Sequence, residues 1–177
     1  MDDTENSNEE PKSEIEKAGE DLFHFAINRD ELKWLMARLH EQAEINRETV
    51  EYELQALKII ATGWALAYYL ENSPYKQQLL AHFWQQVFEF SKSLSETTGL
   101  MTGQDIDYFQ ILKQRLDTYV TTLEKHPDIK EPAEAIGPEF AHICGNAEDL
   151  FTRMTGAKLF MTVVRRVKES LEAIKLI

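Results

Sequence analysis

The chain has 177 residues and a formal net charge of −12, with 43% hydrophobic and 28% charged residues. These values are typical of a soluble globular chain of one domain, and they exclude a disordered protein. The single cysteine, Cys144, excludes an internal disulfide framework and argues against a cysteine-rich zinc site.

The acidic residues are concentrated at the beginning of the chain. Residues 1–21 contain nine acidic residues and two lysines, but only one isoleucine and no aromatic residue. Such a segment has too little apolar surface to offset the entropy lost on ordering. We predict a disordered acidic tail over residues 1–21 and a single helical-bundle domain over residues 22–177. The tail does not resemble a secretory signal and its charge disfavours nucleic acid, so we expect a cytoplasmic protein that binds no nucleic acid.

The longest nearly uncharged segment covers residues 59–70. As a helix it would span about 18 Å, whereas a bilayer core is roughly 30 Å thick. The segment therefore indicates a buried helix, and a membrane partner is not expected.

Beyond residue 27, apolar residues recur at intervals of three and four, without sustained alternation of period two. The pattern predicts an all-α fold, namely an antiparallel bundle of four to five helices. A capping box formed by Asn28 and Glu31 marks the start of the first helix, and no strong stop signal follows before Pro74. We therefore predict an overlong first helix over residues 28–71, about 60 Å in length.

The remaining helices are marked by three kinds of residue: proline in the first turn, serine or threonine as the N-cap, and glycine at the C-terminal end. Their predicted ranges are residues 74–98, 102–126, 138–155 and 157–177.

The segment HFWQQVFEF, residues 82–90, spreads its aromatic rings and Val87 over an arc of about 160°, with His82 on the other side. So wide an arc is typical of a helix packed against two or more neighbours, and the segment is predicted to form the centre of the core. Gly63, in the most apolar part of the first helix, indicates close packing by a neighbouring helix, with a bend as the alternative.

Candidates for catalysis or metal binding are few. Glu139 and His142 have the spacing used in di-iron carboxylate bundles, but only one such pair occurs and His142 points away from the apolar stripe, so they are weak metal candidates. Cys144 lies within reach of the core stripe and is expected to be a buried thiol. A nucleophile is the less favoured alternative, because no inward histidine is present to lower the pKa of the thiol. His40 and His126 are assigned to a solvated flank and a helix end. We predict no enzyme, metal or cofactor, although a site assembled from separate helices stays open.

The preferred function is a non-enzymatic interaction or adaptor protein, forming a homodimer and presenting helical seams to a protein partner. The apolar stripe in the first half of the overlong helix is narrow, the last helix has a heptad seam, and neither has an obvious cover within the chain. Trp34 lies opposite the first seam, where a tryptophan indicates a contact. The predicted interaction residues are Trp34, Leu32, Leu35, Leu39, Phe160, Val164, Val167 and Leu171.

Two alternative functions remain. The core of a helical bundle can hold a small apolar ligand or cofactor, and this chain has enough aromatic residues to line such a site. A peripheral protein of a membrane or storage-granule surface would instead use the last helix, where Arg165, Arg166 and Lys168 form a basic cluster.

Overall fold

The computed structural model describes residues 13–39 and 45–177, which form seven α-helices and no β-strand. The helices are α1 (Glu14–Ile27), α2 (Asp30–Met36), α3 (Arg47–Tyr69), α4 (Lys76–Thr102), α5 (Tyr108–Lys125), α6 (Ala133–Ile143) and α7 (Leu150–Ala173). Helix α3 is central and packs against each of the other six. The all-α class predicted from the periodicity is confirmed, with more helices than the four to five expected.

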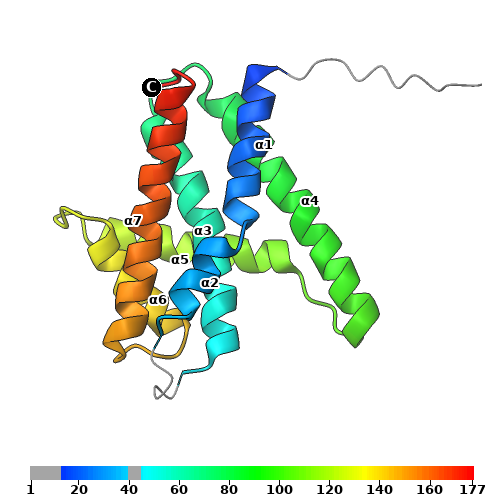
Figure 1. Ribbon diagram of the computed structural model, residues 1–177, viewed down its shortest axis with the longest axis vertical. Helices are drawn as coiled ribbons and strands as arrows, with labels where there is room; N and C mark the ends of the chain where they lie inside the picture. Colours follow the sequence, from blue (N-terminus) through cyan, green and yellow to red (C-terminus); the bar gives the residue numbers. More distant parts are fainter. Residues whose placement is uncertain (1–12, 40–44) are drawn as a thin grey trace, which may run out of the picture.

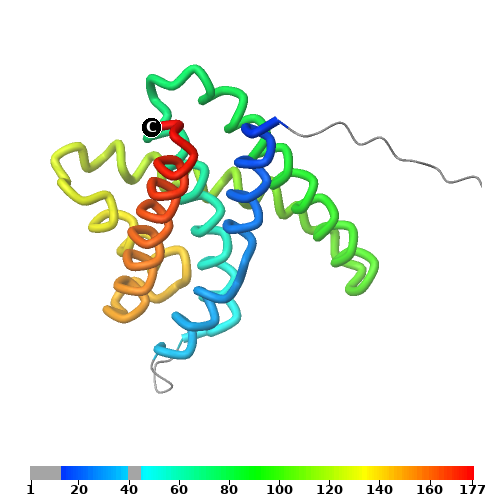
Figure 2. The backbone as a smooth tube through the Cα atoms, turned by 45° about the horizontal axis from the view of Figure 1, so that its top comes forward, coloured from blue at the N-terminus to red at the C-terminus, as the bar shows by residue number. Residues whose placement is uncertain are grey.

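The helices do not simply alternate in direction. Figures 1 and 2 show that α3 and α7 run in the same direction, whereas α1 and α4 run opposite to α3. Helix α5 crosses the others at a steep angle, and the C-terminal end of α4 leans away from the rest of the structure (Figure 1).

The prediction of one overlong helix over residues 28–71 is wrong. Helix α2 ends at Met36, and α3 begins after Asn46, whose side chain accepts a hydrogen bond from the amide of Thr49 at 3.1 Å. The backbone of Asn46 is extended, with φ −73° and ψ 97°, so no helix continues through it. An asparagine N-cap thus starts a second helix where the apolar spacing alone indicated continuity.

Part of the predicted tail is helical. Ser13 and Glu16 form a capping box at the start of α1, and Ala18 and Gly19 are buried. Helix α1 packs against α4, where a Cβ at Gly19 would lie 2.7 Å from the ring of His82. Small residues therefore allow a close approach that offsets the low apolar content of residues 14–21. Residues 1–12, the rest of the predicted tail, lie outside the described part of the chain.

Two helix ends that involve glycine differ from the predicted ends. Helix α4 continues past Gly99 and ends at Gly103, which has a φ of 69°. The helix predicted over residues 138–155 is divided, because Gly145 has a φ of 77° and Asp149 caps a new helix. Pro138 lies inside α6 and does not open it.

Close packing at Gly63 is confirmed, but the neighbour is a side chain: a Cβ at Gly63 would lie 2.4 Å from the ring of Trp84 on α4. In the segment HFWQQVFEF, Phe83 and Val87 are fully buried, as expected for a core. Phe88 and Phe90 nevertheless remain 42% and 36% exposed. The prediction of a core that includes every ring is therefore wrong. Phe90 meets Phe23 of α1 with the ring centres 6.0 Å apart, and Phe88 meets Phe109 of α5 at 5.1 Å, so both rings pack at the edge of the core.

The contact at Gly63 gives a prediction for stability. Gly63→Ala should lower the free energy of unfolding by about 1–3 kcal/mol, because the added methyl group displaces the Trp84 ring. Gly99→Ala is the matched control, since the nearest atom to its Cβ lies 3.6 Å away; it should leave stability unchanged or raise it by up to about 1 kcal/mol. Urea unfolding measures both, and equal midpoints would contradict the packing.

Candidate interaction surface along helices α3 and α7

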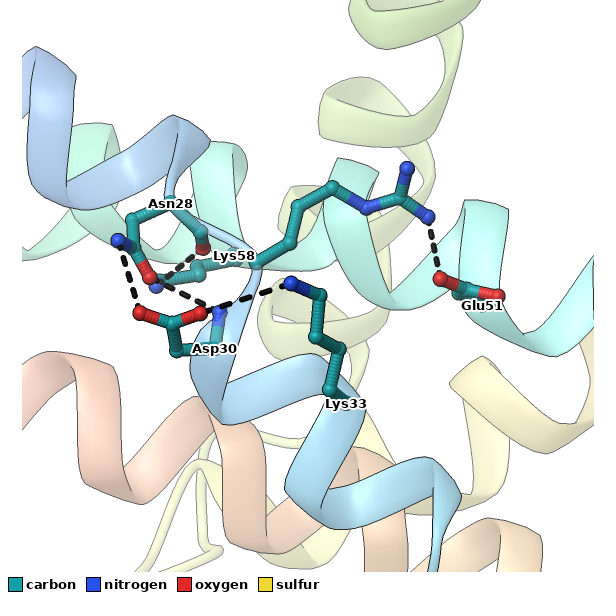
Figure 3. Close-up of polar contacts among 6 residues, drawn as sticks. Asn28, Asp30, Lys33, Glu51 and Lys58 are labelled. Atoms are coloured by element: carbon teal, nitrogen blue, oxygen red, sulfur yellow. Dashed lines mark hydrogen bonds and ion pairs between the residues drawn. The ribbon is translucent and has the colours of Figure 1, made fainter.

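A row of polar side chains on α3 binds the corner between α1 and α2. Lys58 is fully buried, and its Nζ donates to the carbonyl oxygen of Asn28 at 2.8 Å, as Figure 3 shows. The same Nζ lies 2.9 Å from a carboxylate oxygen of Glu31 and 4.4 Å from the centre of the Phe25 ring. Because the ammonium group is fully used within the chain, Lys58 is structural and is not a catalytic candidate.

A second buried ion pair joins α3 to α5. Arg115 donates two hydrogen bonds to the carboxylate of Glu53, at 2.9 and 2.8 Å, and Glu53 is only 3% exposed. Burial, and then the charge of Glu53, raises the pKa of Tyr52 to about 12 and that of Tyr119 well above its usual range. Both phenols therefore stay protonated at neutral pH, and a protonated phenol cannot act as a general base.

The weak metal candidates do not converge. Glu139 accepts a hydrogen bond from the hydroxyl of Thr122 at 3.2 Å, and His142 is exposed near the end of α6. Among residues 13–39 and 45–177, no three histidine, cysteine, aspartate or glutamate side chains lie close enough together to hold a metal ion. His126 contacts the carbonyl oxygen of Thr122 at 2.8 Å, as expected for a helix end, and His40 lies outside the described residues.

Cys144 is buried at the C-terminus of α6. Burial, together with the nearby carboxylate of Glu53, raises the pKa of its thiol to about 12. Since the thiolate is the reactive form, a thiol with this pKa is a poor nucleophile at neutral pH.

The predicted seam residues pack within the chain. The buried members are Leu32, Leu35, Leu39, Phe160, Val167 and Leu171, and Val164 is partly buried. The expectation that they form open seams is wrong, because α2 ends at Met36 as a separate helix and packs against α3 of the same chain. Helix α7 also packs along α3, so its heptad seam is covered by the same chain.

Trp34 differs from the other predicted interaction residues because it is 44% exposed. The guanidinium of Arg38 lies 3.3 Å from the ring centre, and the ammonium of Lys158 lies 4.5 Å from it. A groove of about 380 Å³ between α2 and α7 runs beside the ring. The two cations thus hold Trp34 between α2 and α7.

One interior cavity of the described residues bears on the alternative of an apolar ligand held between helices. A cavity between α3, α5 and α7, lined by residues that include Leu57 and Leu116, has a volume of about 10 Å³. That volume is about enough for one water molecule and is far below the size of a drug-like ligand.

An exposed apolar row covers the first half of α7. Its members, which we name the α7 stripe, are Leu150, Phe151, Met154 and Met161, with exposed fractions of 61%, 52%, 59% and 51%. Spacings of three, four and seven residues place them along one side of the helix. Methionine and aromatic side chains are enriched in protein interfaces, and exposed apolar groups gathered in one place mark interaction sites.

A groove of about 460 Å³ continues from this stripe, between α3, the start of α6 and α7. We name it the aromatic groove, because Trp64, Tyr68 and Tyr69 of α3 and Phe160 of α7 line it. Tyr68 is 60% exposed and lies almost parallel to Trp64, with the ring centres 5.1 Å apart.

The rim of the aromatic groove carries more positive than negative charge. Lys130, Arg165 and Lys168 line it together with one acidic residue, Glu131. The basic cluster noted in the sequence is thereby divided, since Arg166 lines a different groove between α1 and α7.

Comparisons of the chain with protein-family models, curated proteins and solved structures give no match. In the described part of the chain, no helix is both long and apolar enough to cross a membrane. The function must therefore be inferred from the surfaces just described.

The sequence contained a signal for part of these surfaces. Arg165 and Lys168 belong to the basic cluster of the sequence. Tyr68 lies in the predicted overlong helix and Met154 in the predicted helix over residues 138–155, and neither is among the predicted interaction residues. The division of that helix at Gly145 changes the phase of the residues that follow, and this exposes Met154.

The buried ion pair between Glu53 and Arg115 gives a stability prediction. Arg115→Ala should lower the free energy of unfolding by about 2–3 kcal/mol, because it leaves the buried carboxylate of Glu53 unpaired. This loss is smaller than for a fully buried ion pair, since the Arg115 side chain is 29% exposed. Lys92→Ala, which removes an exposed pair with Glu96, should cost less than about 1 kcal/mol. Equal losses in urea unfolding would contradict the assigned role.

Cys144 should react slowly in the folded protein. A pKa raised from 9.0 to about 12 lowers the thiolate fraction at pH 8 about a thousandfold, so modification by Ellman's reagent should be at least that much slower in buffer than in denaturing urea. The rate should increase as the pH rises towards 12. Comparable rates in buffer and in urea would show that the thiol is accessible and ionised.

Proposed function

We propose that the chain is a non-enzymatic interaction protein that forms a homodimer through the α7 stripe. The observation that carries this proposal is the exposure of four large apolar side chains on one side of α7, between 51% and 61% each. Burial of such side chains against a second copy removes apolar area from water, which is the main driving force of association. The titratable groups in the core support a non-enzymatic role, because Glu53 and Lys58 are paired within the chain.

A two-fold axis gives the simplest geometry for this dimer. When two identical helices pair in opposite directions, Leu150 of one copy faces Met161 of the other, and Met154 lies close to the axis. A stable dimer buries about 800 Å² on each partner, which is more than four side chains supply. The interface would therefore extend to neighbouring residues of α7.

The end of α4 supports an adaptor role for the dimer. Leu100 and Met101 are 89% and 81% exposed, and Leu94 is 39% exposed, at the end of the helix that leans away from the rest of the structure (Figure 1). This second apolar surface, on a different helix from the α7 stripe, would stay accessible in the dimer. We assign it to a protein partner.

Sedimentation equilibrium tests the dimer. The unmodified chain should sediment as a concentration-dependent dimer, and Met154→Glu should raise the dissociation constant at least about tenfold, because two carboxylates would be buried near the axis. Met101→Glu is the matched control, since it places the same charge on another exposed methionine and should leave the dimer intact.

Two results would contradict this assignment. If the unmodified chain sediments as a monomer at all concentrations, the proposed dimer does not exist. If Met101→Glu weakens the dimer and Met154→Glu does not, the interface lies on α4 and not on α7.

A further inference from the structure

The aromatic groove contains a preformed stack of rings that runs from the core to the surface. Phe160 is 4% exposed, and its ring centre lies 5.3 Å from that of Trp64. Trp64 in turn stacks on Tyr68 at 5.1 Å, with an angle of 10° between the planes, and Tyr69 meets Tyr68 edge to face at 5.2 Å. The two neighbouring rings fix the plane of Tyr68, so a ligand ring can stack beside it at little cost in side-chain entropy.

The charges around the groove favour an anion, although the chain as a whole has a net charge of −12. Arg165 and Lys168 do have acidic neighbours along α7, namely Glu169 at 3.8 Å and Glu172 at 3.6 Å. Both pairs are about half exposed or more, and such pairs are weak, so the two cations can turn towards a ligand. Lys130 adds a third positive charge, against the single carboxylate of Glu131.

The start of α6 also lies at the groove, where Pro132 and Ala133 line it. The partial positive charge of a helix N-terminus favours anions, but Glu134 in the first turn opposes it here. The amides of Glu134 and Ala135 already donate to the carbonyl oxygens of Glu131 and Pro132. The proposal therefore depends on two features that lie around one groove, the cations and the exposed ring.

We propose that the aromatic groove binds a small planar aromatic anion, with its ring stacked on Tyr68 and its phosphate or carboxylate group held by Arg165 and Lys168. A volume of about 460 Å³ lies within the range of small-molecule sites. A lone inorganic anion would leave the rings unused, and a neutral aromatic compound would leave the cations unused. All the residues that form the site belong to one chain, but Met161 belongs to both the groove and the α7 stripe. Measuring AMP binding in the Met154→Glu variant, which weakens the proposed dimer without changing a groove residue, separates the two proposals.

Isothermal titration calorimetry with four probes tests this proposal. AMP and phenyl phosphate combine a ring with a phosphate group, whereas adenosine and inorganic phosphate each carry only one of these parts. Both combined probes should bind at least about tenfold more tightly than either part. Added salt should weaken the binding of AMP, because the charges on the rim are exposed to solvent.

Matched variants assign the binding to the groove. Tyr68→Ala should weaken AMP binding about tenfold, in line with the loss of one stacking contact. The double variant Arg165→Gln and Lys168→Gln leaves the rings and Lys130 in place and should weaken AMP binding and reduce its salt dependence. Tyr75→Ala and Arg166→Gln change an exposed tyrosine and a neighbouring arginine that do not line the groove, and should bind AMP like the unmodified chain.

Circular dichroism and urea unfolding should show that every variant folds as the unmodified chain does, since Tyr68, Arg165 and Lys168 are all exposed. Failure of both AMP and phenyl phosphate to bind would overturn the proposal. Binding that is unchanged by Tyr68→Ala, or that is lost equally in Arg166→Gln, would overturn it as well.

Discussion

The tertiary structure depends most on the polar face that α3 presents to the corner between α1 and α2. Glu51, Gln55 and Lys58 are spaced by four and three residues, so they lie on one side of the helix. Glu51 pairs with Arg29, Gln55 donates to the carbonyl oxygen of Ala26 at 2.8 Å, and Lys58 donates to the corner itself. A buried ammonium group without partners costs several kcal/mol, so α1 must end where Lys58 can reach its carbonyl oxygens.

That corner determines which surfaces are covered and which stay open. With α1 fixed against α3 and α4, helix α2 continues in the same general direction as α1 and packs against α3, and α7 also packs along α3. The apolar residues of the predicted seams are buried in these contacts. On α7, Met154 and Met161 stay more than half exposed in the described part of the chain, and Met161 lines the aromatic groove together with the exposed ring of Tyr68. The proposed functions of the chain therefore lie on the surface that the core does not need.

Local patterns predicted part of the fold. The periodicity of apolar residues predicted the helical class. The segment around Gly63 was predicted to be buried because its residues are apolar on nearly all sides and Lys58 is its single charged residue. The division of the first helix was missed, because Asn46 is a modest cap signal inside a region with no proline or glycine before Gly63. Of the candidate site, the basic residues on α7 were visible in the sequence. That Lys130 lines the same groove as Tyr68 was not visible, because the two residues belong to segments that are far apart in the chain.

The sequence by itself determined that the chain is helical, that Leu32 and Phe160 belong to apolar faces, and that Cys144 is a buried thiol. Spacing along one chain specifies such faces because helix geometry is local. Only the tertiary structure decided that these faces pack against each other within one chain, and that Met154 and Tyr68 stay exposed. The physical reason is that burial depends on which helix lies opposite, and this follows from distant contacts such as those of Lys58 with Asn28 and Glu31.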